Sequence, residues 1–455
     1  MNRTWFSAAV VASVFAGTVS AQAQPDAGAY LAARHAQLSH DYTYAAQYFT
    51  KGLLADPASM PIMESTVNAL IGLGQFDRAV PVARAMVDQG KAHQIAHLVL
   101  HLDAAKAGRW DDIFYLLENG RSVGPLVDGI TQAWAHLGKG DMARAVASFD
   151  QVIATDGMGV YGVTHKAYAL ASVGDFEGAE AILVAAGQNG LQYNRQSAIA
   201  HAQILSQLGR NDAALTVIAA VFGDQRDPAV DALYRALSSG DAVAYDAVRT
   251  PAHGLADLHL TIAGLLQGEA PDPVTLVYAR AAAHLAPGNT AAVLTSAALL
   301  DNLEQYDLAN DAYSMIGADD PSFHAAELGR ASVLRAAGRR DAAVDVLEAL
   351  AVSYPDMPEV FATKGDTLRQ AERFDDAHAA YTRALELYDR DHASRWFIHY
   401  TRAVTSHKLD DWPAAETDFR AALALNPDQP QVLNYLGYSL VDRGEKLDEA
   451  LGMIR

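Results

Sequence analysis

Three histidines lie four residues apart in the stretch HQIAHLVLH: His93, His97 and His101. On a helix, residues at this spacing share one face, and neighbouring imidazoles there can coordinate one metal ion. No nearby carboxylate clearly completes a tetrahedral set of ligands. The sequence therefore favours the alternative interpretation, in which these side chains pack against a partner helix, and we predict no metal site.

Other patterns typical of enzymes are missing. The chain contains neither G-x-S-x-G nor H-E-x-x-H, and Gly90-Lys91 and Gly138-Lys139 lack the upstream glycine of a phosphate-binding loop. Paired carboxylates such as Asp111-Asp112 and Asp375-Asp376 stand at equivalent turns, where helix capping explains them better than acid–base chemistry. We predict no catalytic residue and no cofactor. An enzyme or metal protein that uses the three histidines is the weaker alternative.

The charge and the cysteine content exclude several kinds of interaction and covalent attachment. Against 34 basic residues stand 54 acidic ones, so the formal net charge is −20, which repels phosphate backbones and makes nucleic acid a poor partner. The chain has no cysteine. Disulfides and acylation of a lipoprotein cysteine are therefore excluded, and the fold depends on packing.

The first 23 residues resemble a secretory signal peptide. A weakly positive start at Arg3 is followed by an apolar stretch over residues 5–16, and Ala21-Gln22-Ala23 is a small-x-small cleavage site. This apolar stretch has about twelve residues, whereas a spanning helix needs roughly twenty. We expect cleavage after Ala23, no membrane span in the mature chain, and a periplasmic or secreted protein. An uncleaved amphipathic N-terminal helix is the alternative.

A short motif repeats along the rest of the chain. In RFDDAHAAYTRALEL, residues 373–387, an acidic turn precedes Ala377, and Tyr381 follows four residues later. The same motif recurs, most often after 34 residues, with a small residue as its anchor in most copies. The anchor positions are Ala45, Ala79, Ile113, Ala145, Ala179, Ala214, Thr275, Ala309, Ala343, Ala377, Ala415 and Ala450.

Other residues at fixed distances from the anchor have structural roles. Six copies place glycine five residues before the anchor, where it ends one helix, and four place proline twelve residues after it, where it ends the next. An Asp or Asn near the turn, such as Asp175 or Asn211, can cap the second helix. The small anchor lets two helices approach closely, and the apolar residue four positions later fills the gap to the neighbour. Each unit is therefore predicted to be an antiparallel helix pair.

With this period and these companions, residues 26–455 resemble tetratricopeptide repeats, and NYLGYSLVDRGEKLDEAL at 434–451 is the most family-like stretch. The resemblance implies an all-α, right-handed α-solenoid of about twelve to thirteen helix pairs. A related helix-pair solenoid of longer period is the structural alternative.

One gap interrupts the repeats. From Ala214 to Thr275 the spacing is too long for one unit and too short for two, and residues 231–248 are compatible with a shortened helix pair. We predict four segments: a signal peptide at 1–23, an N-terminal arm at 24–222, an irregular unit or hinge at 223–254, and a C-terminal arm at 255–455. The last helix is expected to be incomplete and without a polar cap.

The resemblance also implies where a partner would bind, because first helices line the concave face of such solenoids. We expect two apolar, aromatic sets of side chains there, although aromatic stripes at helical spacing are often core. They are Ile95, Leu98, Leu102, Val127, Ile130, Trp134, Tyr161 and Tyr168, and then Phe397, Tyr400, Tyr435 and Tyr438.

The leading hypothesis is a non-enzymatic, exported scaffold or adaptor that binds protein or peptide segments in this groove, in envelope assembly or proteolysis. The family's residues for clamping a C-terminal carboxylate are not matched, since Glu64, Asn68 and Asp366 occupy comparable positions. A structural protein that self-associates through its uncapped C-terminal end is the alternative.

Overall fold

The computed structural model describes residues 27–455, apart from 91–92, 189, 191, 224–226 and 391. The predicted signal peptide at 1–23 lies outside these residues. Within them the chain forms 25 α-helices and no strand. In this described part, every helix is too short or too polar to span a membrane.

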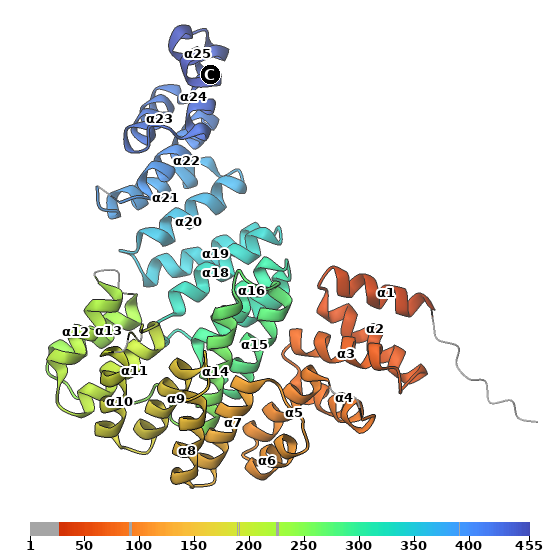
Figure 1. Cartoon of the computed structure of the whole chain (residues 1–455). Coiled ribbons are helices and arrows are strands. Elements are labelled where there is room, and N and C mark those ends of the chain that lie inside the picture. The colour runs from red at the N-terminus through yellow and green to blue at the C-terminus, as the bar shows by residue number, and fades with distance from the viewer. Residues whose placement is uncertain (1–26, 91–92, 189, 191, 224–226, 391) are drawn as a thin grey trace, which may run out of the picture.

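The helices are joined mostly by short turns (Figure 1). The first twelve are α1 (Ala27–Leu38), α2 (Tyr42–Ala55), α3 (Met60–Gly72), α4 (Phe76–Asp88), α5 (Gln94–Lys106), α6 (Trp110–Glu118), α7 (Pro125–Gly138), α8 (Met142–Ile153), α9 (Gly159–Ser172), α10 (Phe176–Gln188), α11 (Arg195–Gln207) and α12 (Asn211–Phe222). The others are α13 (Pro228–Ser238), α14 (Pro251–Leu266), α15 (Asp272–Leu285), α16 (Thr290–Asn302), α17 (Tyr306–Tyr313), α18 (Phe323–Ala336), α19 (Arg340–Ser353), α20 (Pro358–Gln370), α21 (Phe374–Leu387), α22 (Arg395–Lys408), α23 (Trp412–Leu425), α24 (Pro430–Arg443) and α25 (Leu447–Ile454).

The repeated motif marks the second helix of each pair. All twelve anchor positions lie on second helices, and none is more than 2% exposed. The four prolines of the motif each stand two residues beyond the end of such a helix. The predicted α-solenoid of helix pairs is confirmed: twelve pairs form, and α13 is the one described helix without a partner in its own unit.

The turn inside each pair requires a left-handed residue. The six glycines of the motif have φ between 67° and 89°. In four of the six units without glycine at this position, His40, Glu304, Glu372 and Asp410 adopt φ of 55–60°. The turn is therefore set by the packing of the two helices, and glycine only makes it less strained.

The predicted caps are only partly right. Asp175 accepts the backbone N–H of Gly178 at 2.9 Å, as a capping side chain does. Asp111-Asp112 and Asp375-Asp376 instead lie inside the first turns of α6 and α21, where carboxylates favour the positive end of the helix dipole. Asn211 does not cap α12 and donates to the carbonyls of Leu237 and Asp241.

The irregular unit differs from its prediction. Its first half forms α13, but residues 241–250, called here the linking segment, contain no helix, so the shortened helix pair predicted at 231–248 is wrong. The linking segment is held on α11 by side chains: Gln203 Oε1 accepts the N–H groups of Asp246 and Ala247, both at 3.1 Å. Ser206 Oγ accepts the N–H of Val243 at 2.9 Å. These contacts replace the hydrogen bonds of the missing helix.

The linking segment leads into α14 and α15, which lie inside the curve of the N-terminal helices (Figure 1). Helix α14 packs on α5, α7 and α9, and α15 packs on α3 and α5. One continuous apolar core joins the N-terminal helices to Leu255, Leu258 and Leu285 of this insertion. The predicted C-terminal arm at 255–455 thus begins with helices that pack on the N-terminal part, and only α18–α25, called the C-terminal arm from here on, extend away from it (Figure 1).

Polar contacts also hold the insertion. Arg280 on α15 donates to the carbonyl of Gly72 at 3.2 Å, and His284 stacks on Phe76 with ring centroids 4.4 Å apart. Lys106 Nζ donates to His284 Nδ1 at 3.2 Å. Burial, reinforced by the Lys106 charge, lowers the pKa of His284 to about 4, so this imidazole is a neutral acceptor at pH 7.

The two glycines of α14 provide a test of this packing. A Cβ at Gly254 would lie 2.2 Å from the Trp134 ring, whereas a Cβ at Gly264 would meet nothing within 4 Å. We predict that Gly254→Ala lowers the free energy of unfolding by about 1–3 kcal/mol, because the buried indole cannot move aside. Gly264→Ala should raise it by roughly 0.5–1 kcal/mol through helix propensity. Thermal melting of both variants checks this, and equal stabilisation by both would contradict the placement of α14.

Candidate functional site

The eight N-terminal residues of the predicted groove are brought together, but mostly in the core. Six are buried: Leu98, Leu102, Val127, Ile130, Trp134 and Tyr168. Ile95 and Tyr161 are half-buried. These six side chains pack inside the molecule, as the alternative interpretation of the sequence expects.

Trp134 is the centre of this buried set. Its ring is 0% exposed and makes edge contacts with Phe149 at 5.7 Å and with His165 at 6.2 Å between centroids. Its Nε1–H donates to His165 Nδ1 at 3.4 Å. Because Gly254 lies directly against the indole, the ring that sequence reasoning assigned to a partner packs against α14 of the same chain.

Part of the N-terminal groove stays open beside the insertion. A cleft of about 580 Å³ lies between α3, α5 and α15, and Ile95 and Leu98 form part of its wall. Glu64 and Asn68 face it from α3, and Val274 from α15.

The histidine stripe has structural partners. His93 is the residue before α5, His97 Nδ1 donates to the carbonyl of Ser122 at 2.8 Å, and His101 Nε2 donates to that of Arg121 at 2.9 Å. Burial lowers the pKa of His101, so its imidazole is neutral at pH 7. Across the described part of the chain, no three His, Cys, Asp or Glu side chains are placed to hold a metal ion.

The C-terminal set forms an aromatic row over α22 and α24. Centroids of Phe397 and Tyr400 are 6.3 Å apart, those of Tyr400 and Tyr435 are also 6.3 Å apart, and Phe419 on α23 packs beneath both tyrosines. Phe397 is 38% exposed, and Tyr438, one turn beyond Tyr435, is 57% exposed. Unlike Trp134, these rings present part of their surface to solvent.

The repeats that carry this row match a known family model. A family model described as tetratricopeptide repeat matches residues 363–398 and 408–452, which run from α20 to α25. These two stretches are therefore identified as tetratricopeptide repeats. Such repeats generally mediate protein–protein interaction.

Known proteins resemble parts of this chain. It is 31% identical over 154 residues to the TPR repeat-containing protein PA4667 of Pseudomonas aeruginosa, a match that covers 33% of this chain and 25% of that protein. It is 28% identical over 144 residues to human tetratricopeptide repeat protein 13, covering 30% of this chain and 16% of that one. The matches thus span a quarter or less of these curated relatives. Among solved structures, the Cut9–Hcn1 hetero-tetramer of the APC/C is 14% identical, with a TM-score of 0.36 and coverage of 94% of this chain and 93% of that one.

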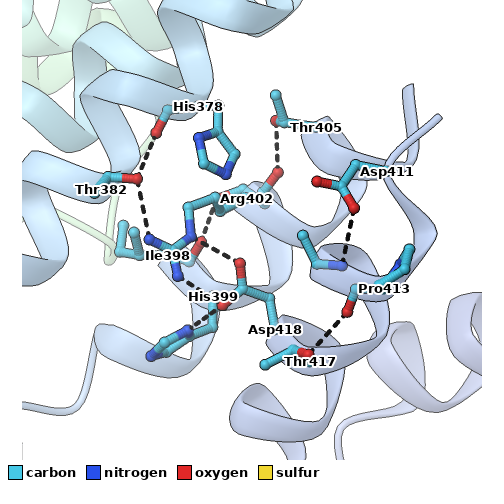
Figure 2. A network of polar contacts seen from close by, with 12 residues as sticks. His378, Thr382, Ile398, His399, Arg402, Thr405, Asp411, Pro413, Thr417 and Asp418 are labelled. Atoms are coloured by element: carbon cyan, nitrogen blue, oxygen red, sulfur yellow. Dashed lines mark hydrogen bonds and ion pairs between the residues drawn. The ribbon is translucent and has the colours of Figure 1, made fainter. Parts of the chain in front are cut away.

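A charged network joins helices α21, α22 and α23 (Figure 2). Arg402 on α22 donates to Asp418 on α23 through Nε at 2.7 Å and Nη2 at 2.8 Å, and through Nη1 to Thr382 on α21 at 3.0 Å. His399 Nδ1 donates to the same carboxylate at 2.8 Å. Arg402 therefore joins three consecutive helices, with the buried Asp418 as its counter-ion.

Sequence reasoning missed this network, although a signal existed. Asp418 stands three residues after the anchor Ala415, a position that is uncharged in the other eleven units. A lone charge there indicates a buried ion pair. Burial by itself would raise the pKa of the Asp418 carboxyl, but the hydrogen bonds from His399 and Arg402, with the arginine charge, outweigh burial and hold this pKa below 3.8.

We predict that Asp418→Asn lowers the free energy of unfolding by about 3 kcal/mol at pH 7, because Arg402 is left buried without its counter-ion. Since the pKa of Asp418 is lower in the folded state, its contribution is present above pH 3.8 and is lost as the pH falls through the folded value. The difference between the parent protein and the variant should therefore shrink below pH 4.

Denaturant unfolding at pH 7 and pH 3 measures this difference. Asp376→Asn is the matched control, because its pair with Arg373 at 2.8 Å is exposed and should contribute only about 0.5 kcal/mol. Equal losses of unfolding free energy for the two substitutions at pH 7 would show that the buried network contributes no more to stability than an exposed ion pair.

Proposed function

We propose that this protein is a non-enzymatic scaffold that binds an apolar peptide segment of a partner protein on the aromatic row of its C-terminal arm. The observation that carries the proposal is the pair of exposed rings, Phe397 and Tyr438, beside two tyrosines fixed by ring contacts. The partner segment is extended or helical. The buried N-terminal set is left out of this proposal because it packs on the protein's own helices.

The physical chemistry of the row supports this assignment. Aromatic side chains dominate the binding energy of many interfaces because a large surface is buried at a small cost in side-chain entropy. Tyr400 and Tyr435 are half-buried and held between neighbouring rings, and His407 Nδ1 lies 3.3 Å from the Tyr435 hydroxyl. The row is therefore ordered before a partner arrives, which lowers the entropic cost of association.

We further propose that the protein is exported and acts in the cell envelope, as an adaptor in assembly or proteolysis. The signal-like residues 1–23 support export. Sequencing of the N-terminus of protein isolated from fractionated cells tests it: the expected first residue is Gln24, in a periplasmic or secreted fraction. An N-terminus at Met1 in the cytoplasm would exclude export.

The binding proposal predicts a loss of partners when the row is truncated. The mature protein and its Phe397→Ala/Tyr438→Ala variant are used to capture proteins from envelope extract, with quantification by mass spectrometry. We expect at least one protein to be captured by the parent and depleted about tenfold or more with the variant, since each ring contributes on the order of 1 kcal/mol or more.

Tyr115→Ala is the control for this experiment. Tyr115 is 66% exposed on α6, far along the chain from the row, so its truncation removes an aromatic surface without touching the proposed site. Identical captured sets for all three proteins would remove the aromatic row as a binding site. Self-association stays the alternative, and growth of particle size with concentration in light scattering would favour it.

A further inference from the structure

A second cleft lies where the two arms meet. Its volume is about 690 Å³, and its walls come from α11, the start of α13, the linking segment, α14 and the turns that precede α16 and α18. Its wall combines apolar residues, namely Ile199, Leu294 and several alanines and prolines, with charged side chains. The cleft is separate from the aromatic row, so a ligand site here is independent of the proposed peptide-binding function.

Both cations of the cleft are already paired. Arg195 donates to the two carboxylate oxygens of Asp227 at 2.9 and 2.7 Å. Arg249 donates to Asp246 at 3.2 Å, and this carboxylate also accepts from Gln203 at 2.7 Å. Two further aspartates, Asp257 and Asp320, face the same space, and no lysine or arginine of the described residues forms an ion pair with either. The lining therefore carries an excess of negative charge.

The two remaining carboxylates differ in how they are satisfied. Asp320 accepts from the hydroxyl of Thr290 and, at 2.8 Å, from the backbone N–H of Ser322. Asp257 is only 7% exposed and lines the cleft from α14. His165 Nε2 lies 4.0 Å from its carboxylate, beyond hydrogen-bond distance. An ionised carboxylate this deeply buried requires a partner.

His165 cannot supply the missing positive charge. Its Nδ1 accepts the Trp134 Nε1–H, and burial, with a contribution from His259, lowers its pKa to about 3. The other titratable groups around Asp257 are Tyr168 of α9 and Tyr245 of the linking segment, whose pKa values are raised by burial and then by the Asp257 charge. On the cleft side, burial followed by the charge of Arg249 lowers the pKa of His253.

From this geometry we infer that the cleft is a binding site for a primary ammonium or guanidinium group, with Asp257 as the counter-ion. The cation enters from the cleft side, and its N–H groups donate to the Asp257 carboxylate, which accepts no hydrogen bond from the part of the chain that the structure describes. The aliphatic stem of the ligand lies along the apolar part of the wall. Such a group is supplied either by a free amine or by a lysine or arginine side chain of a partner.

Calorimetric titration of the purified full chain distinguishes these sources. The probes are cadaverine, Nα-acetyl-lysine amide and Nα-acetyl-arginine amide, and 1-pentanol is the uncharged control. Binding of cadaverine alone would support a free amine, and binding of the blocked amino acids would support a side chain. Pentanol should not bind. Failure of all three cationic probes to bind at millimolar concentration would overturn the inference.

Two charge-matched variants locate the site. Asp257→Asn should weaken binding about tenfold or more, since it removes a charged hydrogen-bond acceptor of nearly the same shape. Asp227→Asn makes the same change in charge in the same cleft, but its carboxylate is already held by Arg195, so we expect a loss of less than about threefold. Equal losses in the two variants would show a diffuse electrostatic effect and exclude Asp257 as the counter-ion.

The unmodified protein gives an independent readout if either variant fails to fold. Burial raises the pKa of Asp257 to about 7, and only the ionised form pairs with a cation. Affinity for the bound probe should therefore rise about tenfold per pH unit up to pH 7 and level off above it. A flat profile between pH 5 and pH 8 would contradict the inference.

Discussion

The apolar inner wall of the N-terminal helices has to be covered, and the chain covers it with its own residues. A curved stack of helix pairs exposes a continuous apolar face unless something fills it, and a large exposed face of this kind is unfavourable in water. Here the linking segment lies on α11, and α14 and α15 fill the space beside α3, α5, α7 and α9. This arrangement fills most of the N-terminal groove, apart from the cleft between α3, α5 and α15, and leaves the C-terminal arm as the part that extends freely.

The two arms therefore differ in how their helices are packed. In the N-terminal part a single core runs from the first helices through Trp134 to the insertion, so its stability depends on contacts between residues more than a hundred positions apart. In the C-terminal arm each unit packs mainly on its neighbours, as in other solenoids. There the network of Arg402, Asp418 and His399 joins consecutive units, and the aromatic row is left at the surface.

The local part of this fold follows from the sequence because its determinants are periodic. The anchors, from Ala45 to Ala450, predict every second helix, since a small residue with its companions has the same role in each pair. The docking of residues 241–286 is not local: no period connects Gly254 to Trp134, and the spacing gap before Thr275 indicates an irregularity without showing where it packs. Phe397, Tyr400 and Tyr435 lie on neighbouring repeats, so the periodic pattern predicts that they come together. Trp134 and Tyr168 face a groove that is filled by helices distant in sequence, and the periodic pattern gives no information about those helices. The sequence pattern around Asp257 does not indicate a buried carboxylate, because its burial depends on the docking of residues 241–286.

Native-state hydrogen exchange tests most directly whether the chain covers its own groove. The decisive amides are those of Val243, Asp246 and Ala247, which lie outside any helix but donate to side chains of α11. The account predicts that these amides are protected about as strongly as those of α7, because they open only when the insertion leaves the groove. Exchange of these three amides at the rate of an unstructured loop, with α7 still protected, would show that the linking segment is not held and would contradict the account.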